Sequence, residues 1–262
     1  MTPLHEALGA AISAARAAGR MLREAMQHRE VATTTKSNRH DVVTEFDRLA
    51  ESMIVERLRA HTPEHGILSE EGARHKGTSG ATWVIDPLDG TNNFVNRLPH
   101  FATSIGLVHG NERLIACVYD PIRDEMFTAI RGHGAQCNGS PLRVSQHAGL
   151  DGAFLGVGVS IHEERRRVTL ERLGSLIAHV RGWRTTGSAA LDLAYVAAGR
   201  LDACWYLSLS AWDVAAGALL VEASGGRVTA LDGMPLDDPQ DGVIASNGSI
   251  HSSMVSCVSG RM

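Results

Sequence analysis

The most informative stretch of the sequence reads Trp83-Val84-Ile85-Asp86-Pro87-Leu88-Asp89-Gly90-Thr91. Its apolar start, followed by Asp-Pro, predicts a short buried strand that ends where the chain becomes charged. A plain turn uses Pro, Asp or Gly, but it does not need a second aspartate three residues after the first. Two neighbouring carboxylates repel each other unless a cation lies between them. The stretch therefore favours a metal site at a strand end over an ordinary Asp-rich turn.

Magnesium is the ion that best fits this pattern. It prefers hard oxygen ligands and needs only a few carboxylates, because water and a substrate phosphate complete its octahedral shell. If a helix starts at Gly90 and Thr91, their backbone N–H groups point at the same place and form a phosphate cradle without a basic side chain. The stretch thus predicts a combined site for a metal and a phosphate.

Further acidic residues occur elsewhere in the chain, and each also has an ordinary explanation. Glu70 opens a Glu-Glu-Gly sequence at the expected end of a strand, where paired glutamates are commonly solvated. Asp213 follows Trp212 at the start of an Ala-rich segment, where a helix N-cap is common. Asp47 stands three residues after Thr44, a spacing typical of a capping arrangement. The local patterns alone do not decide between these roles and a metal site.

The first half of the chain combines helical and strand patterns. Apolar residues at steps of three and four predict a helix over residues 3–27 and a second helix that begins near Thr44. Between them, residues 31–41 are polar loop formers. Short apolar segments separated by Gly, Asn and Pro predict an antiparallel meander. The second helix has an expected buried stripe of Leu49, Met53, Ile54 and Leu58, and the meander strands are 103–108, 114–119, 126–130 and 134–137.

The second half alternates helices and strands, which predicts a second, mixed sheet. The chain has 262 residues, of which 44% are hydrophobic, so it can bury a large core. No linker separates the halves. We therefore expect one compact α/β (α+β) unit made of parts 1–148 and 149–262, with a binding cleft between them. The expected elements are helices 163–180, 188–198 and 212–223, and strands near 154, over 201–206, and near 228 and 243.

Composition argues against several other classes. A net charge of −4 argues against a nucleic-acid partner, since proteins that bind nucleic acids need clustered basic residues. The densest basic run, Arg165-Arg166-Arg167, lies beside two glutamates and is interpreted as the solvated face of a helix. Four widely spaced cysteines and the lack of a leader pattern favour a reduced, cytoplasmic protein. The sequence contains no apolar run of about 18 residues, so it predicts no membrane span.

Motifs of other enzyme classes are missing from the sequence. The 13 histidines show no zinc-ligand spacing, and a G-x-S-x-G nucleophile motif is absent. Gly156-Val157-Gly158 lacks the third glycine of a dinucleotide fingerprint, so it receives no functional weight. The acidic segments remain the best indication of function.

Taken together, these segments resemble the inositol monophosphatase branch of the lithium-sensitive, magnesium-dependent phosphatase superfamily. The resemblance covers nearly the whole chain, and the order of its segments is more specific than any one of them. It implies a homodimer and a layered α-β-α-β-α sandwich with an antiparallel N-terminal sheet and a mixed C-terminal sheet. The matching segments are Lys36, 41–47, 70–72, 83–94, 187–190 and 212–217.

The resemblance also implies a set of metal ligands. One Mg²⁺ would be held by Glu70, Asp86 and the backbone carbonyl of Leu88. A second, bridged by Asp86, would be held by Asp89 and Asp213. A third, more weakly bound ion would depend on Glu70 as a ligand. Li⁺ would inhibit the enzyme. Such cations lower the pKa of a bound water, which would attack the phosphorus.

Roles in proton transfer and loop closure are implied in the same way. Glu70 and a Thr91 hydroxyl paired with Asp47 would orient and deprotonate the attacking water. The loop that carries Lys36 would close over the metals. The phosphate would rest on Gly90 and Thr91.

The implied substrate pocket departs from the family at one position. Members commonly have a glutamate seven residues before the Trp-Asp aspartate, whereas this chain has Tyr206 there. A phenol forms hydrogen bonds but carries no charge at neutral pH, so the preferred alcohol can differ. The remaining residues implied to hold the substrate ring are Asp89, Gly187, Ser188, Ala189 and Asp213.

Three functions follow as hypotheses. The leading one is a Mg²⁺-dependent phosphomonoesterase that acts on inositol monophosphate or a similar polyol or sugar phosphate. The second keeps the chemistry but takes another small phosphate, such as histidinol phosphate, fructose 1,6-bisphosphate or an adenosine bisphosphate. The third is a non-catalytic binding or regulatory protein on the same fold. The presence of every expected ligand favours the two enzyme hypotheses.

Overall fold

The computed structural model describes residues 2–27, 33–35, 42–160 and 162–259. The five helices predicted from apolar periodicity are confirmed within this part of the chain, each to within about four residues. Two shorter helices join them. The helices are α1 (Leu4–Ala25), α2 (Glu45–His61), α3 (Thr91–Val95), α4 (Glu163–Leu176), α5 (Ala189–Ala197), α6 (Ala211–Ala223) and α7 (His251–Val258), with a 3-10 turn at Pro239–Asp241.

Most strands form two sheets. The larger sheet has the order β10-β9-β8-β7-β6-β5-β3-β4 and the smaller β12-β11-β13-β15-β14, while β1 and β2 pair separately. The strands are β1 (Thr33–Thr35), β2 (Val42–Thr44), β3 (Gly66–Ser69), β4 (Arg74–His75), β5 (Ala81–Asp89), β6 (Ala102–His109), β7 (Glu112–Asp120), β8 (Glu125–Ile130), β9 (Ala135–Cys137), β10 (Ser140–Pro141), β11 (Phe154–Val157), β12 (Gly182–Arg184), β13 (Ala203–Tyr206), β14 (Arg227–Thr229) and β15 (Val243–Ser246).

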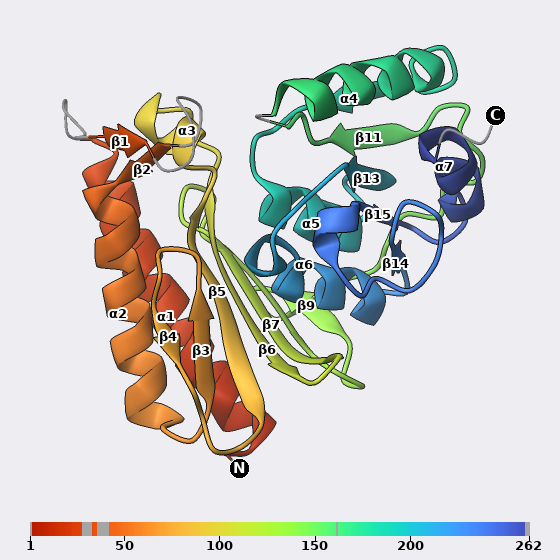
Figure 1. The fold of residues 1–262 in the computed structure, drawn as a ribbon. Coiled ribbons are helices and arrows are strands. Elements are labelled where there is room, and N and C mark those ends of the chain that lie inside the picture. The colour runs from red at the N-terminus through yellow and green to blue at the C-terminus, as the bar shows by residue number, and fades with distance from the viewer. Residues whose placement is uncertain (1, 28–32, 36–41, 161, 260–262) are drawn as a thin grey trace.

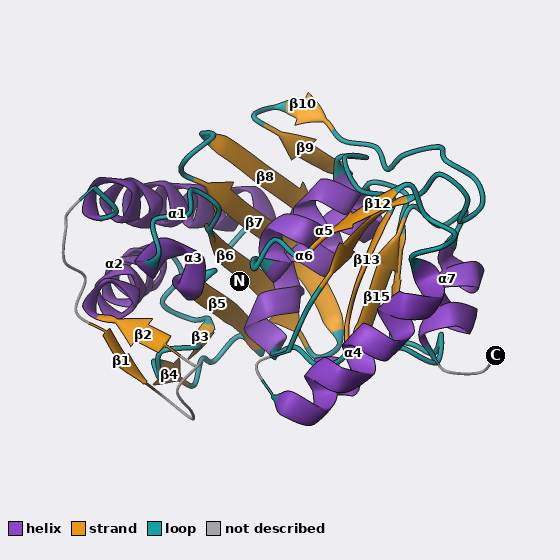
Figure 2. Cartoon of the chain, turned by 90° about the horizontal axis from the view of Figure 1, so that it is seen from above, coloured by secondary structure: helices purple, strands orange, loops and turns teal. Residues whose placement is uncertain are grey.

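Helices and sheets alternate in five layers, as the predicted α-β-α-β-α sandwich requires. Helices α1 and α2 cover one face of the larger sheet, and α5 and α6 lie between the two sheets (Figure 1). Helices α4 and α7 cover the outer face of the smaller sheet. The view from above shows the same arrangement (Figure 2). The larger sheet precedes residue 142 and the smaller follows residue 153, on either side of the predicted boundary; the two-part division itself stays a prediction.

The N-terminal sheet is antiparallel except at one pair of strands. Strand β3 runs parallel to β5, with Ser69 opposite Ile85, so the sheet is mixed. This pairing follows from the chain path, because β3 and β5 are joined through the short edge strand β4 rather than by a direct hairpin. The meander predicted for β6 to β9 is confirmed.

Helix α2 begins at the predicted cap. The Thr44 side chain accepts hydrogen bonds from the backbone of Phe46 and Asp47, and the Asp47 carboxylate accepts one from the Thr44 backbone. The predicted stripe was partly wrong, because Leu49 is 47% exposed. Ala50 takes its place in the core beside Ile54 and Leu58. Because Ala50 is small, it lets the helix approach the sheet closely. The sequence pattern favoured Leu49 for this buried position because leucine is larger and more hydrophobic.

Strand β5 is longer than predicted. The chain does not leave the core at Asp86 but continues as strand to Asp89, with an irregularity in its pairing to β6 between these two residues. Both aspartates are buried, at 2% and 8% exposed. The sequence-based expectation that the strand ends where the chain becomes charged is therefore wrong, because both aspartates lie inside the protein at the end of β5.

The described part of the chain contains no helix that is both long and apolar enough to cross a membrane. Its four cysteines are free thiols, and Cys117 and Cys204 are buried. Lys36, the residue implied to lie on a closing loop, falls outside the described residues.

A buried histidine ties the C-terminal helix to the smaller sheet. The two ring nitrogens of His251 lie 2.8 Å from the Ser246 hydroxyl and 2.9 Å from the Thr229 hydroxyl. Burial, and to a lesser degree Arg227, lowers the pKa of His251 to about 4. The ring is therefore neutral in the folded protein near neutral pH.

This predicts an acid-dependent loss of stability. The pKa of His251 is lower in the folded than in the unfolded chain, where it is about 6.5, so the unfolded chain binds the extra proton as pH falls from about 6.5 to 4. At about 1.4 kcal/mol for each unit of pKa, His251→Gln should remove about 3 kcal/mol of this acid-induced loss. Urea unfolding from pH 4 to 7 measures it. Substitution of the exposed His179 by Gln is the control, and an equal effect of both variants would contradict the prediction.

Candidate active site

Three aspartates from different parts of the chain meet at one point. Asp86 and Asp89 come from the end of β5, and Asp213 comes from the first turn of α6. One carboxylate oxygen of each residue lies within 4.8 Å of the others. Asp86 also accepts a 3.0 Å hydrogen bond from the backbone N–H of Leu88. The predicted pair of carboxylates and the distant Asp213 thus form one cluster.

Glu70 lies beside this cluster because of the parallel pairing of β3 and β5. Ser69 is opposite Ile85, and the Glu70 backbone N–H donates a 3.1 Å hydrogen bond to the Ile85 carbonyl. This places Glu70 next to Asp86, whose pKa it raises. Glu70 is half-buried and stands outside the set of three oxygens within 4.8 Å.

The C-terminal half of the chain holds Asp89. Its carboxylate accepts a short hydrogen bond from the Ser188 hydroxyl, and bonds of 2.8 and 3.3 Å from the backbone N–H groups of Ala190 and Ala189. These donors form the N-terminus of α5, where the helix dipole favours a negative charge. The contact joins residues about 100 positions apart. It fixes Asp89 from a second element, so the predicted Ser188 and Ala189 act on this carboxylate.

Asp213 keeps the capping role that its sequence position suggests. Its carboxylate accepts a 2.7 Å hydrogen bond from the backbone N–H of Ser210, just before α6. Capping uses one carboxylate oxygen. The same side chain also belongs to the aspartate cluster, so the two alternatives left open by the sequence are both realised in the geometry.

The cluster concentrates uncompensated negative charge. Burial is the main reason that the pKa of Asp86 and of Asp213 is raised well above the usual range, followed by Glu70 for Asp86 and by Asp89 for Asp213. Burial also raises the pKa of Asp89 to about 6, although its three hydrogen bonds act to lower it. Among the described residues, no lysine or arginine forms an ion pair with these aspartates. The residues therefore fit a divalent cation, which would supply the missing positive charge.

The Thr91 hydroxyl lies between the buried carboxylate of Asp47 and the Leu88 carbonyl beside the cluster. The Thr91 hydroxyl lies 3.0 Å from Asp47 and 3.1 Å from the Leu88 carbonyl, two acceptors for one proton. Asp47 also accepts hydrogen bonds from the backbone and hydroxyl of Thr44, at 2.8 and 2.5 Å. Burial raises the pKa of Asp47, and these bonds oppose the rise. Asp47 is thus both the cap of α2 and the partner of Thr91.

A pocket of about 390 Å³ opens next to the aspartate cluster. Three of the predicted substrate residues line it together with the implied ligands Asp89 and Asp213, whereas Ser188, Gly90 and Thr91 do not. The sequence did not identify the residues that surround them. The lining comprises Asp89, Asn92, Gly158, Val159, Ser160, His162, Arg165, Thr185, Gly187, Ala189, Tyr206, Leu207, Ser208, Leu209, Ser210 and Asp213. Of the predicted residues, then, Asp89, Gly187, Ala189, Tyr206 and Asp213 share one cavity.

Tyr206 presents its ring to the pocket, but its hydroxyl is already engaged. It donates a 2.6 Å hydrogen bond to buried Asp192, which also accepts one from Thr186. Burial raises the pKa of Asp192 to about 7 despite these two bonds. A Cβ at Gly158 would stand 1.8 Å from the Tyr206 ring, so this glycine is required by the close approach. Gly158 thus has a packing role beside Tyr206, and the sequence-based conclusion that Gly156-Val157-Gly158 is no dinucleotide fingerprint stays a prediction.

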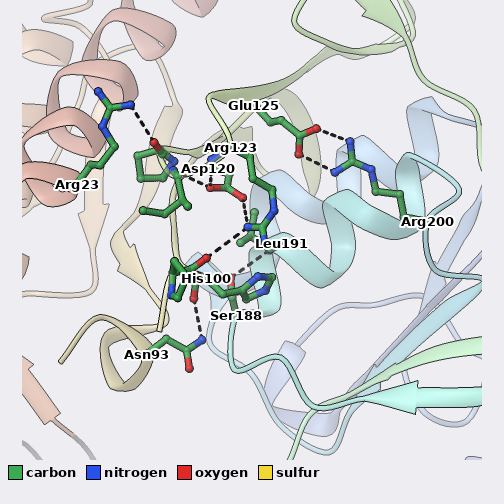
Figure 3. Close-up of polar contacts among 12 residues, drawn as sticks. Arg23, Asn93, His100, Asp120, Arg123, Glu125, Ser188, Leu191 and Arg200 are labelled. Carbon is green, nitrogen blue, oxygen red and sulfur yellow. Dashed lines mark hydrogen bonds and ion pairs between the residues drawn. The ribbon is translucent and has the colours of Figure 1, made fainter. Parts of the chain in front are cut away.

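Asn93 joins the two halves of the site. Its side-chain amide nitrogen lies 2.7 Å from the His100 carbonyl and 2.8 Å from the Thr186 carbonyl, just before Gly187 and Ser188. Figure 3 shows Asn93 reaching the His100 segment, with Ser188 close by. On the other side of this segment, the Arg123 guanidinium donates to the Pro99 carbonyl and pairs with Asp120 at 2.8 Å. Asn93 therefore fixes the loop that carries the Ser188 donor to Asp89.

If the cluster holds Mg²⁺, as the resemblance implies, we expect Asn93→Asp to weaken Mg²⁺ binding about tenfold. A carboxylate has nearly the same shape but cannot donate to two carbonyls, so the Ser188 loop should shift away from Asp89. Calorimetric titration of the protein with Mg²⁺ measures this. Asn96→Asp is the control, because Asn96 donates only to the Asn92 carbonyl on the surface. A normal Mg²⁺ response of Asn93→Asp would show that the loop is held without this amide.

Fold and site together define a layered α/β protein with a largely buried acidic cluster at the edge of a pocket of about 390 Å³. The chain belongs to the inositol monophosphatase family, whose model matches residues 4–260. Membership of this family supports phosphatase activity.

The similar proteins carry two kinds of name, SuhB and inositol monophosphatase. The chain is 46% identical to "Nus factor SuhB" of Pseudomonas aeruginosa, with 86% of each chain covered, and 44% identical to "Nus factor SuhB" of Salmonella typhimurium, with 88% and 87% covered. The solved extragenic suppressor protein suhB of Bartonella henselae superposes with a TM-score of 0.93 at 36% identity, covering 97% of this chain and 98% of that one. Inositol monophosphatase of Anabaena gives 0.84 at 36% identity, covering 96% and 94%.

Proposed function

We propose that this protein is a Mg²⁺-dependent phosphomonoesterase that hydrolyses inositol monophosphate or a similar polyol or sugar phosphate. The observation that carries the proposal is the aspartate cluster, in which Asp86 and Asp89 are buried and Asp213 is half-buried. The cluster lacks a cationic partner among the described residues and borders a pocket of about 390 Å³. A pocket of this size accommodates a ligand as large as a sugar phosphate. A solved relative is described as an inositol monophosphatase with inositol monophosphate bound, at 28% identity and a TM-score of 0.78.

Two to three Mg²⁺ ions would be held by five groups. When bound, the ions supply Lewis acidity to the phosphate and lower the pKa of water toward neutrality. The chain's own residues position the ligands: α5 fixes Asp89 and the α6 cap fixes Asp213. The holding groups are Glu70, Asp86, the Leu88 carbonyl, Asp89 and Asp213.

Proton transfer would use the hydroxyl between the cluster and Asp47. Because the Thr91 hydroxyl donates to Asp47, its oxygen can accept a proton from the attacking water while its own proton passes to the Asp47 carboxylate. Glu70, half-buried beside Asp86, is the second candidate base. The backbone of Gly90 and Thr91, where α3 begins, would bind the phosphate.

A second candidate function is that of a binding or regulatory protein. The relatives named Nus factor SuhB favour it, since that name describes a factor rather than a hydrolase. On this alternative a protein or nucleic-acid partner would be expected, in contrast to the sequence-based expectation. The two functions do not exclude each other. A homodimer and a cytoplasmic location belong to the proposal as well.

The test is phosphate release from a panel of esters with and without Mg²⁺. The panel contains inositol 1-phosphate, glycerol 2-phosphate, histidinol phosphate, fructose 1,6-bisphosphate and an adenosine bisphosphate. We expect Mg²⁺-dependent release led by inositol 1-phosphate and inhibited by millimolar Li⁺. A preference for another ester would keep the chemistry and change the substrate. No release from any ester would leave the binding function as the better account.

A further inference from the structure

Two basic side chains line the same pocket as the aspartate cluster. His162 and Arg165 come from the start of α4, an element that contributes nothing to the cluster itself. The sequence suggested that the run 165–167 is the solvated face of a helix. That interpretation is correct for the helix but incomplete, because Arg165 also borders the pocket.

The three consecutive arginines have different contacts. Arg167 pairs with Glu171 at 2.6 Å on the helix surface. Arg166 donates from Nε to the Ser160 carbonyl at 3.2 Å and so holds the turn before α4. The guanidinium of Arg165 forms no hydrogen bond or ion pair with any other described residue. Of the three, only Arg165 is both at the pocket and without an anionic partner in the described structure.

The turn that carries these residues is itself fixed. The His162 backbone N–H donates to the Ser160 hydroxyl at 3.1 Å, and the Arg166 backbone N–H donates to the His162 carbonyl at 2.9 Å. His162 is the N-cap of α4 and Arg165 lies in its first turn, and both residues line the pocket. Glu163 and Glu164 occupy the same first turn but do not line the pocket.

The remainder of the lining offers no competing negative charge. Apart from Asp89 and Asp213, the charged or titrating residues of the pocket wall are His162, Arg165 and Tyr206, and the Tyr206 hydroxyl is donated to Asp192. Cations bound at the aspartates would neutralise that side of the pocket. A free guanidinium at the rim then attracts a second anion.

We propose that this pocket has a second anion subsite at Arg165 and His162, so that the preferred substrate carries an anionic group in addition to the phosphate that is hydrolysed. This inference rests on the proposed function and specifies its substrate class: a six-carbon or similar phosphate ester whose other end bears a phosphate or a carboxylate. The shared chemistry is a group of anionic oxygens that a guanidinium can bind.

Three open-chain esters with the same six carbons test the subsite. Glucitol 6-phosphate has a neutral far end, 6-phosphogluconate a carboxylate and glucitol 1,6-bisphosphate a phosphate. We expect kcat/KM with Mg²⁺ to be about tenfold higher for at least one of the anionic esters, which also identifies the preferred group. Arg165→Gln should reduce this preference to within threefold, mainly through KM. Arg167→Gln, whose partner is Glu171, is the matched control and should keep the preference.

Equal kcat/KM for all three esters in the native protein, or a preference that survives Arg165→Gln, would overturn the proposal. If the native protein hydrolyses none of them, the proposed function fails, and a binding measurement then tests the subsite. Calorimetry with Mg²⁺ would compare the phosphonates in which methylene replaces each ester oxygen, since these cannot be hydrolysed. Tighter binding of the bisphosphonate that depends on Arg165 would support the subsite, and equal binding would refute it.

Discussion

Phosphate release by the Asp86→Asn variant is expected to fall at least a thousandfold at saturating Mg²⁺. Asp86 lies in the cluster with Asp89 and Asp213, next to Glu70, and the resemblance gives it the bridging position between two ions. Metal binding supplies several kcal/mol of transition-state stabilisation, and each 1.4 kcal/mol corresponds to about a tenfold change in rate. Asparagine has the same shape but no charge, so the fold should persist. Initial rates of phosphate release measure the effect.

The same variant should be more stable than the native protein without metal. Burial and three neighbouring carboxylates disfavour the ionised Asp86 side chain, and asparagine removes this repulsion. We therefore expect a higher Tm without Mg²⁺ and a smaller rise in Tm when Mg²⁺ is added. Asp241→Asn, at an exposed position, is the control and should match the native protein in both respects. An equal Mg²⁺-induced rise in Asp86→Asn would mean that the cluster is not the metal site.

Thr91→Val is expected to lower kcat about a hundredfold with little change in KM. The substitution keeps the size of the side chain but removes the hydroxyl that lies 3.0 Å from Asp47. General acid–base groups contribute about 10² to 10⁴ to enzymatic rates, so the loss of this link should appear in kcat. Steady-state kinetics on the best ester of the panel measures both constants.

Thr91→Ser is the matched control, because serine keeps a hydroxyl at the same position. It should retain activity to within about fivefold. If Thr91→Ser and Thr91→Val lose activity equally, packing rather than proton transfer explains the role of Thr91. If both remain fully active, Glu70 is the better candidate for the base.

Much of the fold could be predicted because it depends on local patterns. Apolar periodicity located the long helices, and the Thr44 to Asp47 spacing located the start of α2. The Asp86 and Asp89 pair indicated the candidate site, because a second aspartate had no structural explanation nearby, and the structure brings Asp213 to the same place. The end of β5 was misplaced, since the sequence shows charge but not the burial that distant elements impose on it.

The rest of the site depends on contacts between residues that are far apart in sequence. Ser188 reaches Asp89 across 99 positions, and no local pattern near either residue reports this bond. Tyr206 was expected to form a hydrogen bond to the substrate through its hydroxyl. In the structure this hydroxyl donates instead to Asp192, which lies on another element. Arg165 could not be distinguished from its two neighbours by composition, because its position beside the pocket depends on how α4 packs on the smaller sheet.

We propose that the aspartate cluster binds Mg²⁺ and that the bound ions make the protein a phosphatase. The most direct test is the initial rate of phosphate release from inositol 1-phosphate by chelator-treated native protein as Mg²⁺ is restored. We predict no release without the metal and a saturable recovery as Mg²⁺ is added. Release that is unaffected by chelation, or no release at any Mg²⁺ concentration despite a folded protein, would contradict the claim.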